Sequence, residues 1–205
     1  MPPQPWLFSR RLDLLAFGGS FLLALAFVGL GAALGRLQDP LPLGLWLVLV
    51  VGVDVMHVHA TWLRTYLDPA ALRANLGAFL LVPCLAYGLG VGLHAYGALP
   101  FWRTLAYLAV FHFIRQQVGW VALYQREDPT LGDFDRRLDR AVIYVSTLWP
   151  LLWWHAHLPR PFAWFMAGDF APGLPPWLPD LLLPLYGGLL VAYLLRQGWL
   201  GWRER

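Results

Sequence analysis

Six long apolar segments constrain the fold of this chain more than any other feature of the sequence. They cover residues 12–34, 41–63, 76–96, 101–124, 141–157 and 178–195, and the fifth is the shortest. A hydrocarbon core about 30 Å thick requires roughly 20 apolar residues of helix. Because lipid offers no partners to backbone polar groups, such segments are expected to be helical. The sequence therefore predicts an all-α, polytopic integral membrane helix bundle of about six transmembrane helices, a single domain over residues 1–205.

Composition supports a membrane protein and excludes several other classes. The chain is 59% hydrophobic and 13% charged, whereas soluble domains carry about 25% charged residues. All its basic residues are arginine, so lysine Schiff-base chemistry, as in a retinal-binding rhodopsin, is excluded. These arginines are scattered and form no basic stripe, so we expect no nucleic-acid partner. The single cysteine, Cys84, excludes an intrachain disulfide. We also expect no cleaved signal peptide, because the N-terminus lacks a short apolar region with a cleavage site.

The arginines also predict the orientation of the chain. If the N-terminus is cytoplasmic, only Arg36, Arg103 and Arg160 fall outside and Arg115 lies within a span, while every other arginine faces the cytoplasm. Cytoplasmic loops are enriched in arginine. This asymmetry favours six spans with both termini cytoplasmic, in the inner (cytoplasmic) membrane of a cell.

Two connecting segments have an unusual composition. Residues 158–179 are rich in proline and tryptophan, and irregular backbone cannot face lipid. We expect this segment to be an outer interfacial cap with a short helix near residues 162–166. Residues 125–140 form the only strongly charged connection, and we expect a short amphipathic helix on the cytoplasmic face.

The second apolar segment contains an unusual group of ionisable residues. In an α-helix, where residues advance by about 100°, Asp54 and His57 share one face and His59 points nearly opposite to His57. A carboxylate within the bilayer costs roughly 2.5–3.5 kcal/mol on insertion scales, so these residues are functional candidates.

The fourth segment contains a comparable polar stripe. His112, Arg115 and Gln116 lie on one helical face, and the helical rise places both His112 and Asp54 near the mid-plane. We expect Asp54, His57 and His112 to bind a metal, with His59 as a further ligand if the helix is distorted. Arg115 and Gln116 are then catalytic candidates that compensate charge and orient an imidazole or a substrate head group. A purely structural Asp54–Arg115 ion pair is the alternative, and it leaves both histidines unexplained.

Three further histidines are predicted near the outer boundary of the membrane. His94, His155 and His157 end the third and fifth segments, and Asp169 of the cap is expected to approach them. They form a candidate second cluster. Ordinary hydrogen-bonded or interfacial histidines are the competing interpretation.

These residues favour an integral membrane metalloenzyme of the oxygenase or hydroxylase type. Histidine and carboxylate ligands with open positions are typical of non-haem iron, and burial in the bilayer indicates a lipid, isoprenoid or quinone substrate. The alternatives are a b-type haem electron-transfer subunit, in which histidines on facing helices hold haem b, a proton-coupled transporter, and a small structural subunit. The expected partners are the lipid bilayer, a hydrophobic small molecule, and a homo-oligomer or larger membrane complex.

Overall fold

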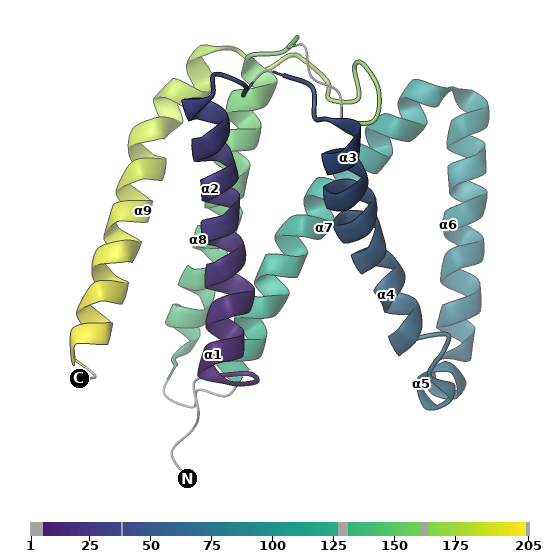
Figure 1. The fold of residues 1–205 in the computed structure, drawn as a ribbon, viewed down its shortest axis with the longest axis horizontal. Coiled ribbons are helices and arrows are strands. Elements are labelled where there is room, and N and C mark those ends of the chain that lie inside the picture. Colours follow the sequence, from purple (N-terminus) through teal and green to yellow (C-terminus); the bar gives the residue numbers. More distant parts are fainter. Residues whose placement is uncertain (1–5, 38, 127–130, 161–163, 204–205) are drawn as a thin grey trace. The chain divides into compact units, whose positions relative to one another are not determined.

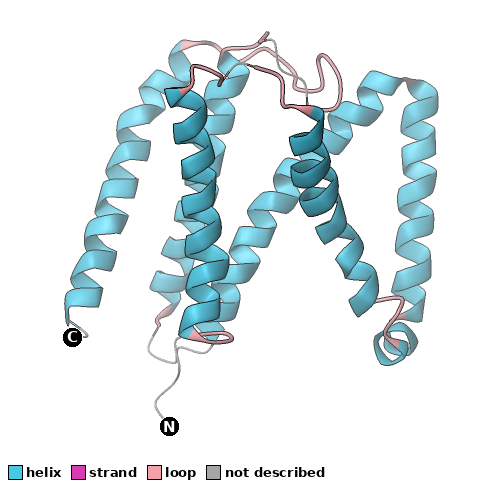
Figure 2. Cartoon of the chain, in the orientation of Figure 1, coloured by secondary structure: helices cyan, strands magenta, loops and turns pink. Residues whose placement is uncertain are grey.

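The computed structural model describes residues 6–37, 39–126, 131–160 and 164–203. All regular structure in these residues is helical and none of them lies in a strand, which confirms the all-α prediction. Figure 1 follows the helices along the chain, and Figure 2 shows that loops and turns join them. The chain divides into an N-terminal unit, Ser9–Gly92, and a C-terminal unit, Leu93–Arg205 together with Met1–Phe8. The positions of the two units relative to each other are not determined, so a single domain over residues 1–205 stays a prediction.

Two long helices of the N-terminal unit each contain a π-helical stretch. The first comprises α1 (Arg10–Asp13), η1 (Leu14–Gly19) and α2 (Ser20–Ala33), and the second comprises α3 (Leu43–Trp46), η2 (Leu47–Val55) and α4 (Met56–Arg64). The short α5 (Pro69–Ala74) and the long α6 (Leu76–Tyr96) follow, and the last turn of α6 belongs to the C-terminal unit. π-Helical turns are rare and occur often at functional sites. The second stretch is notable because it contains Asp54.

Local sequence explains where these helices begin and end. The Ser9 hydroxyl accepts a hydrogen bond from the Leu12 amide at the start of α1, and the Asp68 carboxylate accepts from the Ala70 amide at the start of α5. Both are the side-chain caps that helix N-termini require. After α2, Gly35 adopts a φ of 65°, and the amide of Arg36 donates to the carbonyl of Gly31. Glycine suits this left-handed position because it has no Cβ to clash.

The helices of the N-terminal unit make few contacts with one another. Within its described residues, extensive contacts join only consecutive segments of the same helix, such as α3 with η2. One tertiary link is the Tyr66 hydroxyl, which donates to the carbonyl of Phe79 on α6 at 2.7 Å. The most apolar stretch of each of its three long helices contains no buried residue in the described structure. Packing inside this unit therefore contributes little to its stability.

The C-terminal unit is a packed group of three helices. They are α7 (Ala98–Arg126), α8 (Asp133–Ala156) and α9 (Trp177–Arg203), and α8 packs against both of the others. The buried apolar core of this unit includes the small and β-branched side chains Ala106, Ile114, Val118, Val142 and Ala156 on the helices and Phe170 in the segment between α8 and α9. Small residues let the backbones of neighbouring helices approach closely, which favours packing in a membrane.

A polar network fastens the three helices where α7 ends, α8 begins and α9 ends. The Asp139 carboxylate on α8 accepts hydrogen bonds from the Gln125 amide at 2.6 Å and from the Tyr193 hydroxyl at 3.0 Å. One turn earlier on α8, Asp135 forms an ion pair with Arg196 of α9. The network joins all three helices, and the half-buried Asp139 carboxylate is compensated because both of its oxygens accept hydrogen bonds.

The segment between α8 and α9 is held by one carboxylate and one guanidinium. Asp169 is 1% exposed, and one of its oxygens accepts hydrogen bonds from the backbone amides of Trp164, Phe165 and Met166. Arg103 of α7 donates through Nε and Nη2 to the carbonyl of Gly168. Of the helix predicted at residues 162–166, residues 162–163 lie outside the described residues, and 164–166 form a bend. The position of this segment at the outer membrane surface stays a prediction.

Four helices of the described residues are long and apolar enough to cross a membrane. They span Arg10–Ala33, Leu43–Arg64, Leu76–Tyr96 and Trp177–Trp202, which correspond to the predicted first, second, third and sixth segments. The predicted fourth and fifth segments are also helical, as α7 and α8, but these two helices are not among the four. A multi-pass membrane protein is thus supported, whereas the count of six spans and the cytoplasmic termini stay predictions.

One predicted boundary is corrected by the structure. Residues 133–140 do not form a separate amphipathic helix, because they are the first turns of α8, which begins at Asp133 rather than at residue 141. The Asp135 carboxylate accepts a hydrogen bond from the amide of Gly132, so the chain enters the helix earlier than its apolar pattern suggests.

Candidate functional site

The structure brings two of the predicted metal ligands together. Asp54, at the end of η2, and His57, in α4, lie on one side of the same helix, with Oδ1 of Asp54 3.6 Å from Nδ1 of His57. Both side chains are partly exposed in the described structure. The distance is too long for a hydrogen bond. Two ligand atoms that bind one metal ion tetrahedrally, each at about 2.1 Å, stand roughly 3.4 Å apart. The separation of Asp54 and His57 therefore suits two ligands of one ion.

His59 does not join this pair. Its Nδ1 lies 2.9 Å from the carbonyl oxygen of Val55, and its ring packs at 5.8 Å from the ring of Trp62. A carbonyl only accepts hydrogen bonds, so Nδ1 of His59 carries a proton and donates. The direction of His59 agrees with the helical spacing, which places it away from His57. Its predicted role as a further ligand stays a prediction.

The other predicted residues belong to the C-terminal unit. On α7, His112 and Arg115 are exposed and Gln116 is half-buried, and Nη1 of Arg115 lies 3.5 Å from the hydroxyl of Tyr144 on α8. Because Asp54 and His57 are in the N-terminal unit, their approach to His112 or Arg115 stays a prediction. Within the described residues, no three histidine, cysteine, aspartate or glutamate side chains gather as a metal site would require.

The three histidines of the predicted second cluster make different local contacts. His94 packs edge-on against Phe101 at 5.5 Å, and His157 stacks on Trp153 at 4.2 Å, with its Nδ1 2.7 Å from the Trp153 carbonyl oxygen. The carboxylate of Asp169 faces backbone amides of its own segment. The third histidine, His155, has a side-chain partner on another helix.

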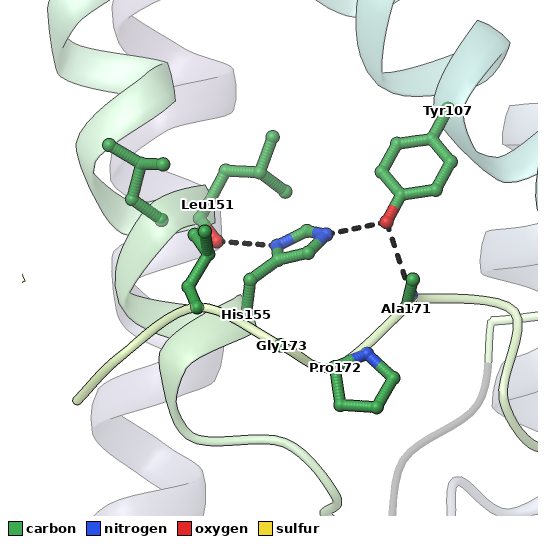
Figure 3. Close-up of a pocket in the computed structure, with 8 residues that line it drawn as sticks. Tyr107, Leu151, His155, Ala171, Pro172 and Gly173 are labelled. Atoms are coloured by element: carbon green, nitrogen blue, oxygen red, sulfur yellow. Dashed lines mark hydrogen bonds between the residues drawn. The ribbon is translucent and has the colours of Figure 1, made fainter. Parts of the chain in front are cut away.

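His155 of α8 and Tyr107 of α7 form a polar pair between these two helices. Nδ1 of His155 lies 2.7 Å from the carbonyl oxygen of Leu151, and its Nε2 lies 2.7 Å from the Tyr107 hydroxyl (Figure 3). Since the carbonyl can only accept, Nδ1 bears a proton, and the tautomer with that proton alone leaves Nε2 to accept from the Tyr107 hydroxyl. The Ala171 amide in turn donates to the Tyr107 oxygen at 3.1 Å. The geometry thereby fixes one tautomer of His155.

Two open pockets border this pair. The first is about 380 Å³ and is lined by Tyr107 and His155 together with residues of α8 and of the segment after it, including Leu151, Ala171 and Leu174. The second is about 440 Å³, and its walls are apolar and aromatic apart from one threonine: Val110, Phe113, Thr147, Pro150, Leu151, Trp154, Trp164 and Phe170. Phe170 contacts the rings of both Tyr107 and His155 and also lines the second pocket. Volumes of 300–1,000 Å³ are typical of small-molecule sites.

Sequence reasoning missed Tyr107 as a site residue. A tyrosine in an apolar helix carries no motif, and its partner His155 lies 48 residues further along the chain. The helical spacing alone could not pair these residues, because the pairing depends on how α7 and α8 pack. The Asp139 network was missed for the same reason, although the charged run at residues 133–140 was a visible signal.

Comparison with known proteins returns no match to a family model, to a curated protein or to a solved structure.

Proposed function

We propose that this chain is a multi-pass membrane protein that uses a transition metal, with iron as the leading candidate, to oxidise a hydrophobic substrate. The observation that carries the proposal is the Asp54–His57 pair, which places a carboxylate oxygen 3.6 Å from an imidazole nitrogen within an apolar helix. An ionisable pair at such a position costs free energy in a membrane, so its presence indicates a function. Carboxylate and imidazole are the ligand types of non-haem iron sites.

The helix around this pair gives the proposal further support. Asp54 lies in the last turn of the π-helical stretch η2, and π-helical turns occur often where a helix positions functional side chains. Asp54 and His57 are proposed as two ligands. His112 is proposed as a third on the basis of its sequence position, with Arg115 compensating negative charge and Gln116 orienting a ligand. Bound there, the metal would supply open coordination positions for the oxidation of a lipid-soluble substrate.

The first test is the metal content of the purified protein. Wild-type protein prepared without chelators should hold a transition metal in stoichiometric amount by elemental analysis. His57→Ala and Asp54→Asn should each lower the metal content at least 10-fold, because loss of a ligand typically costs that much affinity or more. His94→Ala is the matched control, since it removes a histidine that the proposed site does not use.

Some outcomes would contradict the proposal. Metal-free wild-type protein, or metal content that survives both substitutions, would leave the Asp54–His57 pair as a structural feature. A haem absorption spectrum in the same preparation would favour the haem b alternative instead. Metal retained in His112→Ala with loss in His57→Ala would keep the site but remove His112 from it.

A further inference from the structure

The hydrogen bonds of Tyr107 and His155 leave one acceptor position open. Nδ1 of His155 donates to Leu151, and Nε2 accepts the Tyr107 proton. The Tyr107 oxygen accepts one hydrogen bond, from the Ala171 amide. A phenolic oxygen has a second lone pair, and this lone pair takes no partner among the described residues. With the tyrosine proton committed to His155, the pair offers a ligand an acceptor rather than a donor.

The surroundings define the rest of the ligand. The pocket of Tyr107 and His155 is otherwise lined by leucine, alanine, proline and glycine, and the neighbouring pocket is lined by aromatic and aliphatic side chains apart from Thr147. Neither lining includes an arginine, aspartate or glutamate, so a charged head group would have no counter-charge there. Phe170 is 8% exposed, contacts the rings of Tyr107 and His155, and lines the apolar pocket. The polar pair therefore lies directly beside that pocket.

We propose that these two pockets bind an uncharged lipid alcohol, such as an isoprenoid alcohol. Its hydroxyl donates to the Tyr107 oxygen, and its hydrocarbon chain lies against Phe113, Trp164 and Phe170. The site is built entirely from the C-terminal unit and requires no metal. This proposal can therefore be tested independently of the metal proposal. Tyr107 and His155 recognise the head group, and the aromatic pocket recognises the chain.

The test compares two photoreactive probes that differ in one hydrogen-bond donor. Full-length protein in detergent is labelled with a diazirine derivative of farnesol and with the methyl ether of the same compound. Labelled peptides are then identified by mass spectrometry. Wild-type protein should bind the alcohol about 3- to 10-fold more tightly than the ether, the range expected for one net hydrogen bond. The label should fall on α7, α8 or the segment at residues 164–174.

Two pairs of variants separate recognition of the head group from recognition of the chain. Tyr107→Phe should reduce the alcohol-to-ether ratio to about 1, whereas Tyr186→Phe, the same change on α9, should preserve it. Val110→Trp should fill the apolar pocket and weaken labelling by both probes, whereas Leu194→Trp, at an exposed position of α9, should not. The alcohol-to-ether ratio is measured within each variant, so a partial loss of folded protein lowers the labelling by both probes and leaves the ratio unchanged.

Equal labelling of wild-type protein by alcohol and ether would overturn the role of Tyr107. Labelling unchanged in Val110→Trp, or label located outside the C-terminal unit, would overturn the proposed position of the chain. Loss of metal in the variants of Asp54 or His57 bears on neither result.

Discussion

The two units both consist of helices, but the helices of each unit are held together differently. In the C-terminal unit, polar and aromatic side chains reach from one helix to another, as in the bonds of Asp139 to Gln125 and Tyr193. In the N-terminal unit, Asp54 and His57 contact each other on one helix, and His59 contacts the backbone of that same helix. An apolar sequence therefore decides that helices form, but interhelical contacts decide which helices pack, because lipid gives them no hydrophobic reason to associate.

This comparison assigns different roles to polar residues in the two units. In the C-terminal unit, Asp139, Gln125, Tyr193, Asp135 and Arg196 hold α7, α8 and α9 together. Among the described residues of its own unit, the Asp54–His57 pair contacts no second helix, so its cost in an apolar helix is not offset by helix packing there. This is why the pair carries the functional proposal, and why substitutions in the two units should differ in their effect on stability.

The largest effect is expected at the polar network of the C-terminal unit. Asp139→Ala removes the acceptor of both Gln125 and Tyr193 and leaves the buried Gln125 amide without its carboxylate partner. It should lower the free energy of unfolding by about 3 kcal/mol, measured by denaturant titration in detergent. Asp133→Ala, at an exposed position of the same helix, should cost less than about 1 kcal/mol. Equal losses would show that the network does not hold the helices.

A smaller difference is expected from packing alone. Ile114 is 5% exposed in the C-terminal unit, whereas Leu22 of the N-terminal unit is 65% exposed. Ile114→Ala should cost about 2 kcal/mol through the cavity that it leaves, and Leu22→Ala should cost less than about 0.5 kcal/mol. Thermal unfolding of both variants in the same detergent provides the measurement. A Leu22→Ala cost as large as that of Ile114→Ala would mean that the N-terminal helices are also packed.

The smallest effect is expected in the segment after α8. Asp169→Asn keeps an oxygen acceptor but removes the negative charge that three backbone amides share, so it should cost about 1 kcal/mol. Hydrogen exchange at residues 164–166 should accelerate several-fold, while exchange in α7 and α9 stays unchanged. Asp180→Asn, an exposed carboxylate in the first turn of α9, is the control. Unchanged exchange in Asp169→Asn would show that other contacts order this segment.

Particular residues show what could be predicted of the site. The spacing of Asp54 and His57 predicted their shared face, because neighbours three apart on a helix are close whatever the tertiary structure. The same rule correctly separated His59 from His57. The Tyr107–His155 pair could not be predicted, since its residues are far apart in sequence and meet only through the packing of α7 on α8. The buried Asp169 was expected near the histidines, but its carboxylate satisfies the amides of its own turn.

The sequence by itself determined that this chain is helical and contains helices apolar enough to cross a membrane, because hydrophobic length and backbone hydrogen bonding are local properties. It predicted six such segments, and four helices of the described residues are long and apolar enough. It also determined which ionisable residues share a helical face. Only the tertiary structure decided that α8 joins α7 and α9, that Asp139 and Asp169 are structural, and that the Tyr107 hydroxyl meets Nε2 of His155. Those outcomes depend on contacts between distant segments, and a one-dimensional pattern carries no information about which faces meet.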